Sequence, residues 1–117
     1  MPVDIVVGGQ AGDEGKGKIS AYLAVKNNYD YAIRVGGPNA GHTIFFKNRI
    51  YTLKTMPGGF VNKRTKLALG AGAYIITDWL EKEIRLTGAE NRLLIDPHAV
   101  IIEPRHTAAE RADARLM

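Results

Sequence analysis

The feature that most constrains the fold of this chain is a glycine-rich heptapeptide that closely follows an apolar run. The run, residues 3–8, is rich in β-branched side chains and predicts a buried strand. The heptapeptide consists of Gly12, Asp13, Glu14, Gly15, Lys16, Gly17 and Lys18. A helix is predicted from Lys16 to Asn27, because helical spacing there relates Ile19, Tyr22, Leu23 and Lys26. A strand, a glycine-rich turn and a helix in this order form a P-loop-like phosphate cradle, since the helix N-terminus offers N–H groups and the glycines allow close approach.

A second polar loop follows the next predicted strand, residues 30–35. This loop contains glycines together with three polar side chains: an amide, an imidazole and a hydroxyl. Its last five residues are Asn39, Ala40, Gly41, His42 and Thr43. In a parallel α/β sheet, the loops at the carboxyl ends of neighbouring strands converge on one crevice where ligands bind. We therefore expect the two loops to form two walls of a single site.

The rest of the chain predicts an α/β fold with a mostly parallel central sheet, flanking helices and a β-hairpin excursion. A second helix is expected over 78–87, with Thr77 as its cap and Gly88 at its end. Its core-facing stripe is expected to consist of Ile76, Leu80 and Ile84. The other predicted elements are a hairpin of 44–46 and 50–53, a turn at 57–59, strands at 67–69, 93–95 and 100–102, and a helix from Thr107.

Composition limits the classes of protein and site. The 117 residues are enough for one domain with a modest core, and 45% hydrophobic with 24% charged residues is ordinary for a soluble globular protein. We expect no membrane span and no signal peptide, and hence a cytoplasmic location. The absence of cysteine excludes disulfides, thiolate metal sites and cysteine nucleophiles in this chain. A net charge of +4 favours an anionic ligand such as a nucleotide.

Residues 9–18, GQAGDEGKGK, and residues 39–43, NAGHT, together resemble the N-terminal region of the adenylosuccinate synthetase family. Their spacing and the order of strand, loop, helix, strand and loop also fit that family. The chain departs from the family at Ala11, where members often carry a large aromatic residue, and at Pro38. The resemblance covers essentially the whole chain but only the first part of the family. It implies that residues 1–117 are the N-terminal α/β portion of a longer nucleotide-binding ligase domain, truncated at its C-terminal end.

The resemblance also implies a reaction: GTP-dependent ligation of IMP and L-aspartate to adenylosuccinate, through 6-phosphoryl-IMP, as the first committed step of AMP synthesis. It makes Asp13 the catalytic base and His42 the general acid, with Asp13 and the Gly41 carbonyl as ligands of Mg²⁺. A metal-bound carboxylate is a weaker base, because the cation stabilises its charged form. The role of Asp13 therefore requires that the proton leaves as the oxygen attacks, or that nearby lysines stabilise the purine anion. The full-length protein is expected to be a homodimer, and this piece alone is expected to be inactive.

The same resemblance assigns ligand contacts. GTP would be bound by Gly12, Asp13, Glu14, Gly15, Lys16, Gly17, Lys18, Gly41, His42 and Thr43. IMP would be bound by Asp13, Glu14, Gly15, Lys16, Asn39, Ala40, Gly41 and His42. Within these sets, Asn39 would bind the IMP phosphate, Thr43 would lie near the GTP phosphates, and Lys16 would offset negative charge. Lys18 is equally compatible with a solvent-facing position in the first helical turn.

Two alternative functions remain open from the residues themselves. Residues 12–18 satisfy the pattern G-x-x-x-x-G-K of a P-loop module that binds or hydrolyses GTP or ATP, but Ile19 stands where Ser or Thr should ligate magnesium. A basic nucleic-acid-binding domain could use the short basic stretch 62–66, which no RNA-recognition or helix-turn-helix pattern accompanies. That domain would bind with steep salt dependence and without magnesium, whereas the ligase would require the metal. We expect neither a nucleic acid nor a membrane as partner.

Overall fold

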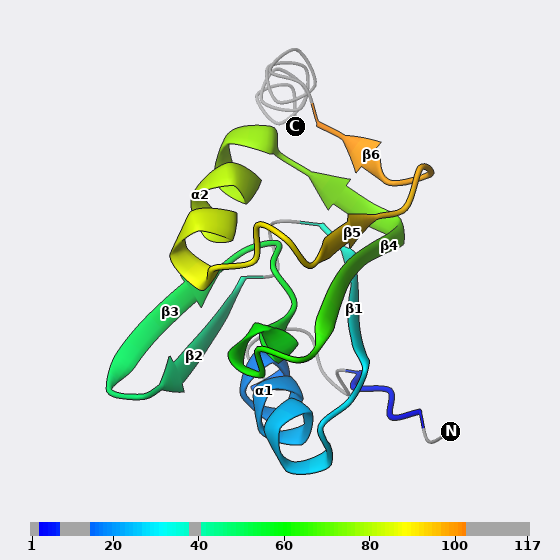
Figure 1. Cartoon of the computed structure of the whole chain (residues 1–117). Helices are drawn as coiled ribbons and strands as arrows, with labels where there is room; N and C mark the ends of the chain where they lie inside the picture. Colours follow the sequence, from blue (N-terminus) through cyan, green and yellow to red (C-terminus); the bar gives the residue numbers. More distant parts are fainter. Residues whose placement is uncertain (1–2, 8–14, 38–40, 103–117) are drawn as a thin grey trace, which may run out of the picture.

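A parallel sheet forms the centre of the computed structural model, which describes residues 3–7, 15–37 and 41–102 (Figure 1). The ten-residue strand β4 lies between β1 and β5, and β6 pairs with the carboxyl end of β4. The strands are β1 (Tyr31–Gly36), β4 (Lys66–Ile75), β5 (Leu93–Ile95) and β6 (Val100–Ile101). All of these pairings are parallel, so the expected α/β fold with a mostly parallel sheet is confirmed.

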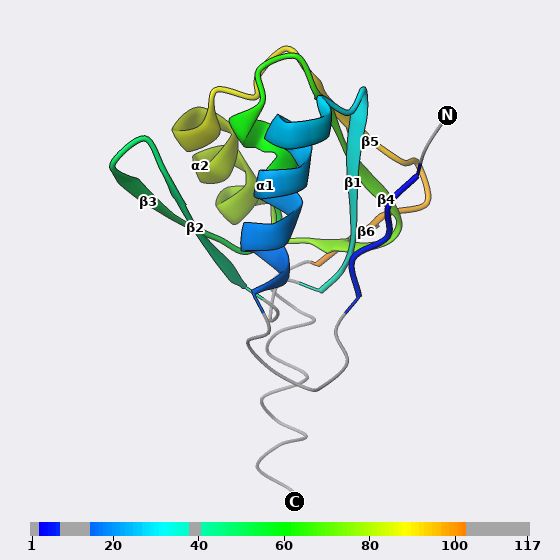
Figure 2. The same cartoon turned by 90° about the horizontal axis from the view of Figure 1, so that it is seen from below.

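Two helices and a hairpin lie on one side of this sheet (Figure 2). They are α1 (Lys16–Asn27), α2 (Thr77–Thr87), the antiparallel strands β2 (His42–Phe46) and β3 (Arg49–Leu53), and a 3₁₀ turn, η1 (Gly58–Val61). The expected hairpin is present, and its turn residues Lys47 and Asn48 both have positive φ, as two-residue hairpin loops favour. Within the described part of the chain, neither helix is long and apolar enough to cross a membrane.

The core lies between the sheet and these elements. Alternate residues of β4, such as Leu67 and Leu69, point into it and are fully buried, as the two-residue period of a strand requires. The ring of Tyr51 meets that of Phe60 edge to face, with 4.9 Å between the centroids. The buried apolar cluster is Ala21, Ile44, Leu53, Met56, Phe60, Val61, Leu67, Leu69, Ala73, Ile75, Leu80 and Ala89. This core fixes the hairpin and η1 against α1, where the polar motifs meet.

The buried face of α1 differs from the predicted one. Its buried residues are Gly17, Ala21 and Ala24, whereas Ile19 and Tyr22 of the predicted stripe are about half exposed. The reason is close backbone packing: a Cβ added to Gly58 would lie 2.9 Å from the Gly17 carbonyl oxygen. Only small residues fit at that separation, so the helix turns its small side chains inward.

The prediction of a strand at the start of the chain is wrong for the residues that the structure describes. Residues 3–7 belong to no strand of the described structure, and Val3, Ile5 and Val7 are between 77% and 80% exposed. Their alternation is that of a strand, but a strand also needs a backbone partner, and none pairs with this segment among the described residues. Residue 8 lies outside those residues.

The strand predicted at 67–69 extends as far as Ile75, through a glycine-containing segment. A Cβ on Gly70 would lie only 2.8 Å from a methyl carbon of Val35. The glycine therefore allows a side chain of β1 to lie over β4, and it does not end the strand. The predicted turn at 57–59 leads into η1, and the predicted strands at 93–95 and 100–102 are β5 and β6, the latter one residue shorter than predicted.

The start of α2 also differs from the prediction. Thr77 is its first helical residue, and Ile76 precedes it in extended conformation with no side-chain cap bond. Because a capping side chain must stand just outside the helix, Thr77 is not the cap. The predicted end is correct, since Gly88 adopts the left-handed conformation, with φ of 69°, that glycine favours. The helix predicted from Thr107 lies outside the described residues.

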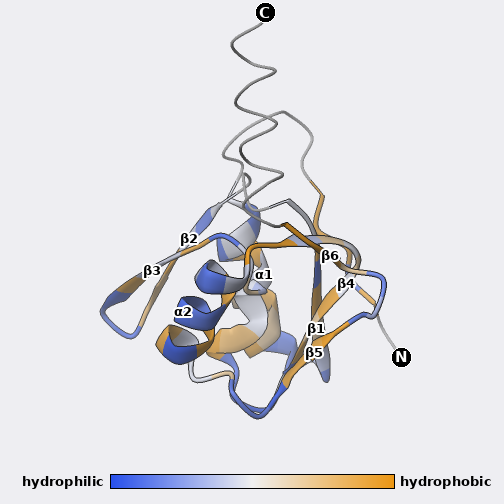
Figure 3. Ribbon diagram, turned by 90° about the horizontal axis from the view of Figure 1, so that it is seen from above, coloured by the Kyte–Doolittle hydropathy of each residue, from blue (hydrophilic) through white to orange (hydrophobic). Residues whose placement is uncertain are grey.

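The other side of the sheet is apolar and exposed. Ile33 and Val35 of β1 are 67% and 59% exposed, and Leu94 of β5 is 54% exposed. Figure 3 shows apolar residues along β1, β4 and β5. The described residues thus cover one side of the sheet and leave a hydrophobic surface on the other.

Candidate functional site

The glycine-rich heptapeptide ends in the first turn of α1. Gly15 stands at the N-cap with φ of 76°, a left-handed conformation that costs glycine little, and its carbonyl accepts a hydrogen bond from the Ile19 N–H at 3.1 Å. Lys16, Gly17 and Lys18 form the first turn. The helix N-terminus, with its partial positive charge, therefore lies within the motif that the sequence associates with phosphate.

Gly17 and His42 bring the two sequence motifs together. A Cβ added to Gly17 would lie 2.7 Å from the Cβ of His42 and 2.9 Å from its Cδ2. Real Cβ atoms do not approach other atoms this closely, so the imidazole packs directly on the glycine backbone. The segment after β3 also packs against this part of α1, because a Cβ added to Gly58 would lie 2.9 Å from the Gly17 carbonyl oxygen.

Two hydrogen bonds hold the His42 ring. A guanidinium nitrogen of Arg34 donates to Nδ1 at 2.8 Å, and the other ring nitrogen, Nε2, lies 2.7 Å from the carbonyl oxygen of Met56. Arginine has only donors, so Nδ1 must act as acceptor and Nε2 must carry the proton. The ring is therefore in the Nε2–H form and donates to Met56.

The pKa of His42 is lowered to about 4. Burial is the main cause and the positive charge of Arg34 adds to it, whereas the hydrogen bond to Met56 opposes the change. The pKa of Arg34 is itself lowered by burial, an effect that the negative charge of Glu83 opposes. At neutral pH the imidazole is thus uncharged in this arrangement. It can donate one hydrogen bond through Nε2, but it holds no dissociable imidazolium proton.

We expect the free energy of unfolding to decrease as the pH is lowered from about 6.5 to about 4. In this window the unfolded state, with an ordinary histidine pKa of 6.5, binds a proton that folded His42 does not bind. The stability that neutral His42 contributes is therefore fully present above a pH of about 6.5, and it is lost as the pH falls toward about 4. Denaturant titrations across this range measure the effect. The same decrease in a His42→Asn variant would contradict it.

The remaining described site residues lie beside this contact. Gly41 immediately precedes β2, and a Cβ there would be 3.4 Å from the carbonyl oxygen of Leu53. Thr43 is exposed and stands opposite Thr52 in the hairpin. Lys18 is exposed on α1, a position compatible with both the solvent-facing alternative and a ligand contact.

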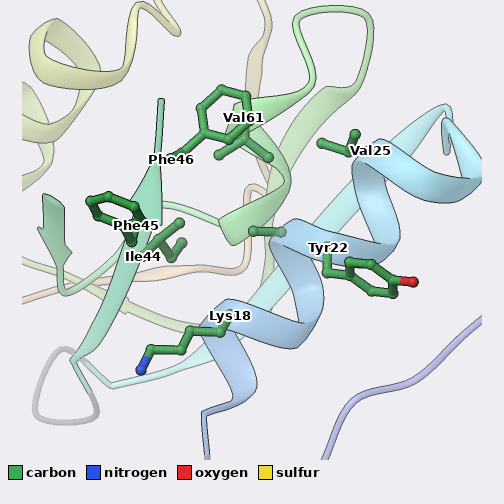
Figure 4. Close-up of a pocket in the computed structure, with 8 residues that line it drawn as sticks. Lys18, Tyr22, Val25, Ile44, Phe45, Phe46 and Val61 are labelled. Atoms are coloured by element: carbon green, nitrogen blue, oxygen red, sulfur yellow. The ribbon is translucent and has the colours of Figure 1, made fainter. Parts of the chain in front are cut away.

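A groove with a volume of about 380 Å³ lies between α1 and β2 (Figure 4). Apart from Lys18 its described lining is apolar or aromatic: Ala21, Tyr22, Val25, Ile44, Phe45, Phe46 and Val61. The amino group of Lys18 points away from these side chains (Figure 4). Phosphate needs several donors, so this groove is not the phosphate cradle.

The predicted site residues Gly12, Asp13, Glu14, Asn39 and Ala40 lie outside the described residues, and their contacts stay predictions. Among the described residues, no group of three or more His, Asp, Glu or Cys side chains could hold a metal. Of the two predicted magnesium ligands, only Gly41 is described, and it would contribute a backbone oxygen.

Sequence reasoning missed the two residues that bond to the His42 ring, Arg34 and Met56, and the buried Glu83 that bonds to the Met56 N–H. Arg34 was read only as part of a strand, and Met56 acts through its backbone, which no side-chain motif reveals. Glu83 stands one residue before Ile84 in the predicted apolar stripe and is buried. A carboxylate at a core position is rare unless it is paired, and this signal could have identified it.

Comparison with known proteins supports the motif-based prediction. A sequence model of the family described as adenylosuccinate synthetase matches residues 5–116. The adenylosuccinate synthetase of Methanococcus aeolicus is 39% identical over 120 residues, which is 99% of this chain and 36% of that protein. The chain therefore spans about a third of the length of this curated relative.

Two solved structures share the fold. The fully ligated adenylosuccinate synthetase from Plasmodium falciparum superposes with a TM-score of 0.77 at 31% identity, covering 87% of this chain and 24% of that one. The succinoaminodeoxyadenylate synthetase of cyanophage S-2L, bound to dGMP and dATP, gives 0.75 at 26% identity, covering 86% and 29%.

Proposed function

This chain belongs to the adenylosuccinate synthetase family, and on that premise we propose that it forms the N-terminal part of an enzyme that ligates IMP and L-aspartate with GTP. Since the chain spans about a third of its relatives, the activity is proposed for the complete protein. The observation that carries the proposal is the contact of Gly17 with His42, which joins the glycine-rich motif to the NAGHT motif. The names of the related proteins indicate the reaction.

The chemistry needs a site that binds two phosphorylated ligands. The 6-oxygen of IMP is a poor leaving group, so GTP first phosphorylates it, and the amino group of aspartate then displaces phosphate. Phosphoryl transfer depends mainly on positioning and on stabilising negative charge. The N-terminus of α1, Lys16 and Arg34 place positive charge around Gly17 and His42 for that purpose.

In this reaction His42 would donate a hydrogen bond to a GTP phosphate. In the described arrangement its Nε2–H is bonded to Met56, so donation to a ligand requires the ring to exchange that carbonyl for a phosphate oxygen. A phosphate beside the ring would also raise its pKa, because an anion favours the protonated form. The ring can thus acquire acid character when the ligand binds.

Magnesium fits the proposed donors by their chemistry. A carboxylate from Asp13, the carbonyl of Gly41 and phosphate oxygens are all hard oxygen ligands, which Mg²⁺ prefers. When bound, the ion would neutralise phosphate charge. Asp13 would also take the purine proton, in the role expected from the resemblance.

One side of the sheet is left uncovered by the described residues, which supports the view that they form part of a larger domain. Monomeric proteins seldom leave a contiguous apolar surface of this kind exposed. About two thirds of the length of the Methanococcus aeolicus relative lies outside the matched segment, and the corresponding part of the complete protein could supply the cover. We propose a cytoplasmic homodimer for the complete protein, as expected from the family.

The phage neighbour favours a second candidate within the same chemistry. Its structure contains dGMP and dATP, so the purine acceptor and the phosphoryl donor of the complete protein could be deoxynucleotides. The higher identity to adenylosuccinate synthetases makes IMP and GTP the first choice.

The test is an omission assay on the complete protein. We expect adenylosuccinate to form, by its ultraviolet absorbance, only when GTP, IMP, L-aspartate and Mg²⁺ are all present. Product from dGMP and dATP in their place would favour the second candidate. Hydrolysis of GTP without IMP or aspartate would instead support a P-loop NTPase and reject the ligase.

A further inference from the structure

Glu83 is a buried carboxylate on the inner face of α2, with 6% of its surface exposed. Burial of a charged side chain is costly unless hydrogen bonds or opposite charge compensate it. Its position three residues after Leu80 would suit an apolar residue of the stripe. The presence of a carboxylate there calls for an explanation beyond packing.

One oxygen of this carboxylate collects three successive backbone donors. Oε1 accepts hydrogen bonds from the N–H groups of Lys54, Thr55 and Met56, at 2.8, 3.0 and 3.2 Å. These residues form the bend that follows β3, where the hairpin ladder has ended. Charge-assisted bonds of this kind are stronger than neutral ones, so Glu83 fixes the course of the bend.

The anchored bend in turn holds the imidazole. The Met56 N–H donates to Glu83, and the carbonyl of the same residue accepts the Nε2–H of His42 at 2.7 Å. Two residues further on, Gly58 is close to the backbone of Gly17. A shift of the bend would therefore move the hydrogen-bond partner of His42 and the backbone beside Gly17 together.

The other polar atoms of the bend show that stability is not optimised here. Glu83 Oε2 and Thr55 Oγ1 are buried without a hydrogen-bond partner among the described residues. Each such atom forfeits part of what burial gains, so packing alone does not account for a carboxylate at position 83. The carboxylate is better explained by what its three bonds position.

We propose that Glu83 is a positioning residue for the proposed ligase reaction: it fixes the bend from Lys54 to Met56 and thereby orients His42. The inference rests on the proposed function for its catalytic consequence, but the orientation of His42 can be tested without it. Glu83 itself is not expected to touch a ligand. A purely structural role, in tying α2 to the hairpin, would leave the ring unaffected.

The first readout is the state of the His42 ring in the complete protein labelled with ¹⁵N-histidine. The His42 signals are assigned by their loss in a His42→Asn variant. We expect Glu83→Ala to change the Nε2–H pattern, because a shifted Met56 carbonyl weakens that hydrogen bond and the proton moves upfield and exchanges faster, while Arg34 still keeps Nδ1 as the acceptor. Glu83→Gln should keep the wild-type pattern, because the amide oxygen can still accept from the bend. The control is Glu81→Gln, which changes an exposed glutamate of the same helix.

The second readout is steady-state kinetics on the same proteins. We expect Glu83→Ala to lower kcat by about 10²-fold, the effect of a misplacement of about 1 Å, with a smaller change in KM for GTP and IMP. Glu83→Gln should recover most of that loss. If Glu83→Ala does not fold, Glu83→Asp replaces it, since the shorter side chain cannot reach all three donors.

An unchanged His42 pattern in the Ala or Asp variant would overturn the proposal. Equal loss of kcat in the Gln and Ala variants, with the pattern retained in Gln, would also overturn it, because charge rather than position would then matter. If the wild-type protein makes no adenylosuccinate, the proposed function fails. The ring pattern still decides whether Glu83 orients His42.

Discussion

Replacing His42 by asparagine is expected to lower kcat of the complete enzyme by about 10²–10⁴-fold, the usual contribution of general acid–base assistance. Asparagine can keep one hydrogen bond to Met56 or Arg34, so the fold around Gly17 should tolerate it. It cannot become protonated beside a phosphate, so the developing charge on that phosphate loses its acid. The KM for IMP should change much less than kcat.

The measurement is steady-state adenylosuccinate formation with each substrate varied in turn. His98→Asn is the matched control, because the His98 side chain is 85% exposed and bonds only to Asp96 among the described residues. The control should retain wild-type kinetics. A His42→Asn enzyme with wild-type kcat would remove His42 from the reaction, whatever its contacts in the folded protein.

Sequence alone predicted the fold where local patterns decide it. Helix α1 begins and ends where the spacing of its residues indicated, and Gly88 ends α2 because few other residues accept its backbone conformation. The hairpin and the alternation of strands and helices were predictable for the same reason. Residues 3–7 were not, because pairing of a strand depends on a partner that the segment itself does not specify.

The candidate site was predictable only in part. The two motifs indicated that Gly17 and His42 belong to one site, and the two residues are in contact, although the strand expected before the first motif is absent from the described residues. The hydrogen bonds that define the His42 ring come from Arg34 and a backbone carbonyl, which are tertiary contacts between segments distant in sequence. Glu83 was predictable only in part: a carboxylate on the core face of α2 signals a buried, paired group, but hydrophobic periodicity does not reveal that its partners are backbone N–H groups of another segment.

Gly17→Ala is expected to be the other severe substitution, because it places a methyl group where the His42 ring lies. The added Cβ would be 2.7 Å from the His42 Cβ, and the ring is held at both nitrogens and cannot simply rotate away. Alanine improves helix propensity by about 1 kcal/mol over glycine, which opposes the effect. Overpacking typically costs about 1–3 kcal/mol, so we expect a net decrease in the free energy of unfolding.

The same substitution should lower kcat of the complete enzyme by about 10²-fold, since the methyl group would displace the imidazole by about 1 Å. Denaturant unfolding and steady-state kinetics measure the two effects. Ile19→Ala, two residues along α1 at a half-exposed position, controls for the change in helix propensity and should leave both nearly unaltered. A Gly17→Ala enzyme with wild-type stability and kcat would show that the helix can move away from His42. The close contact between the two motifs would then not be required for the reaction.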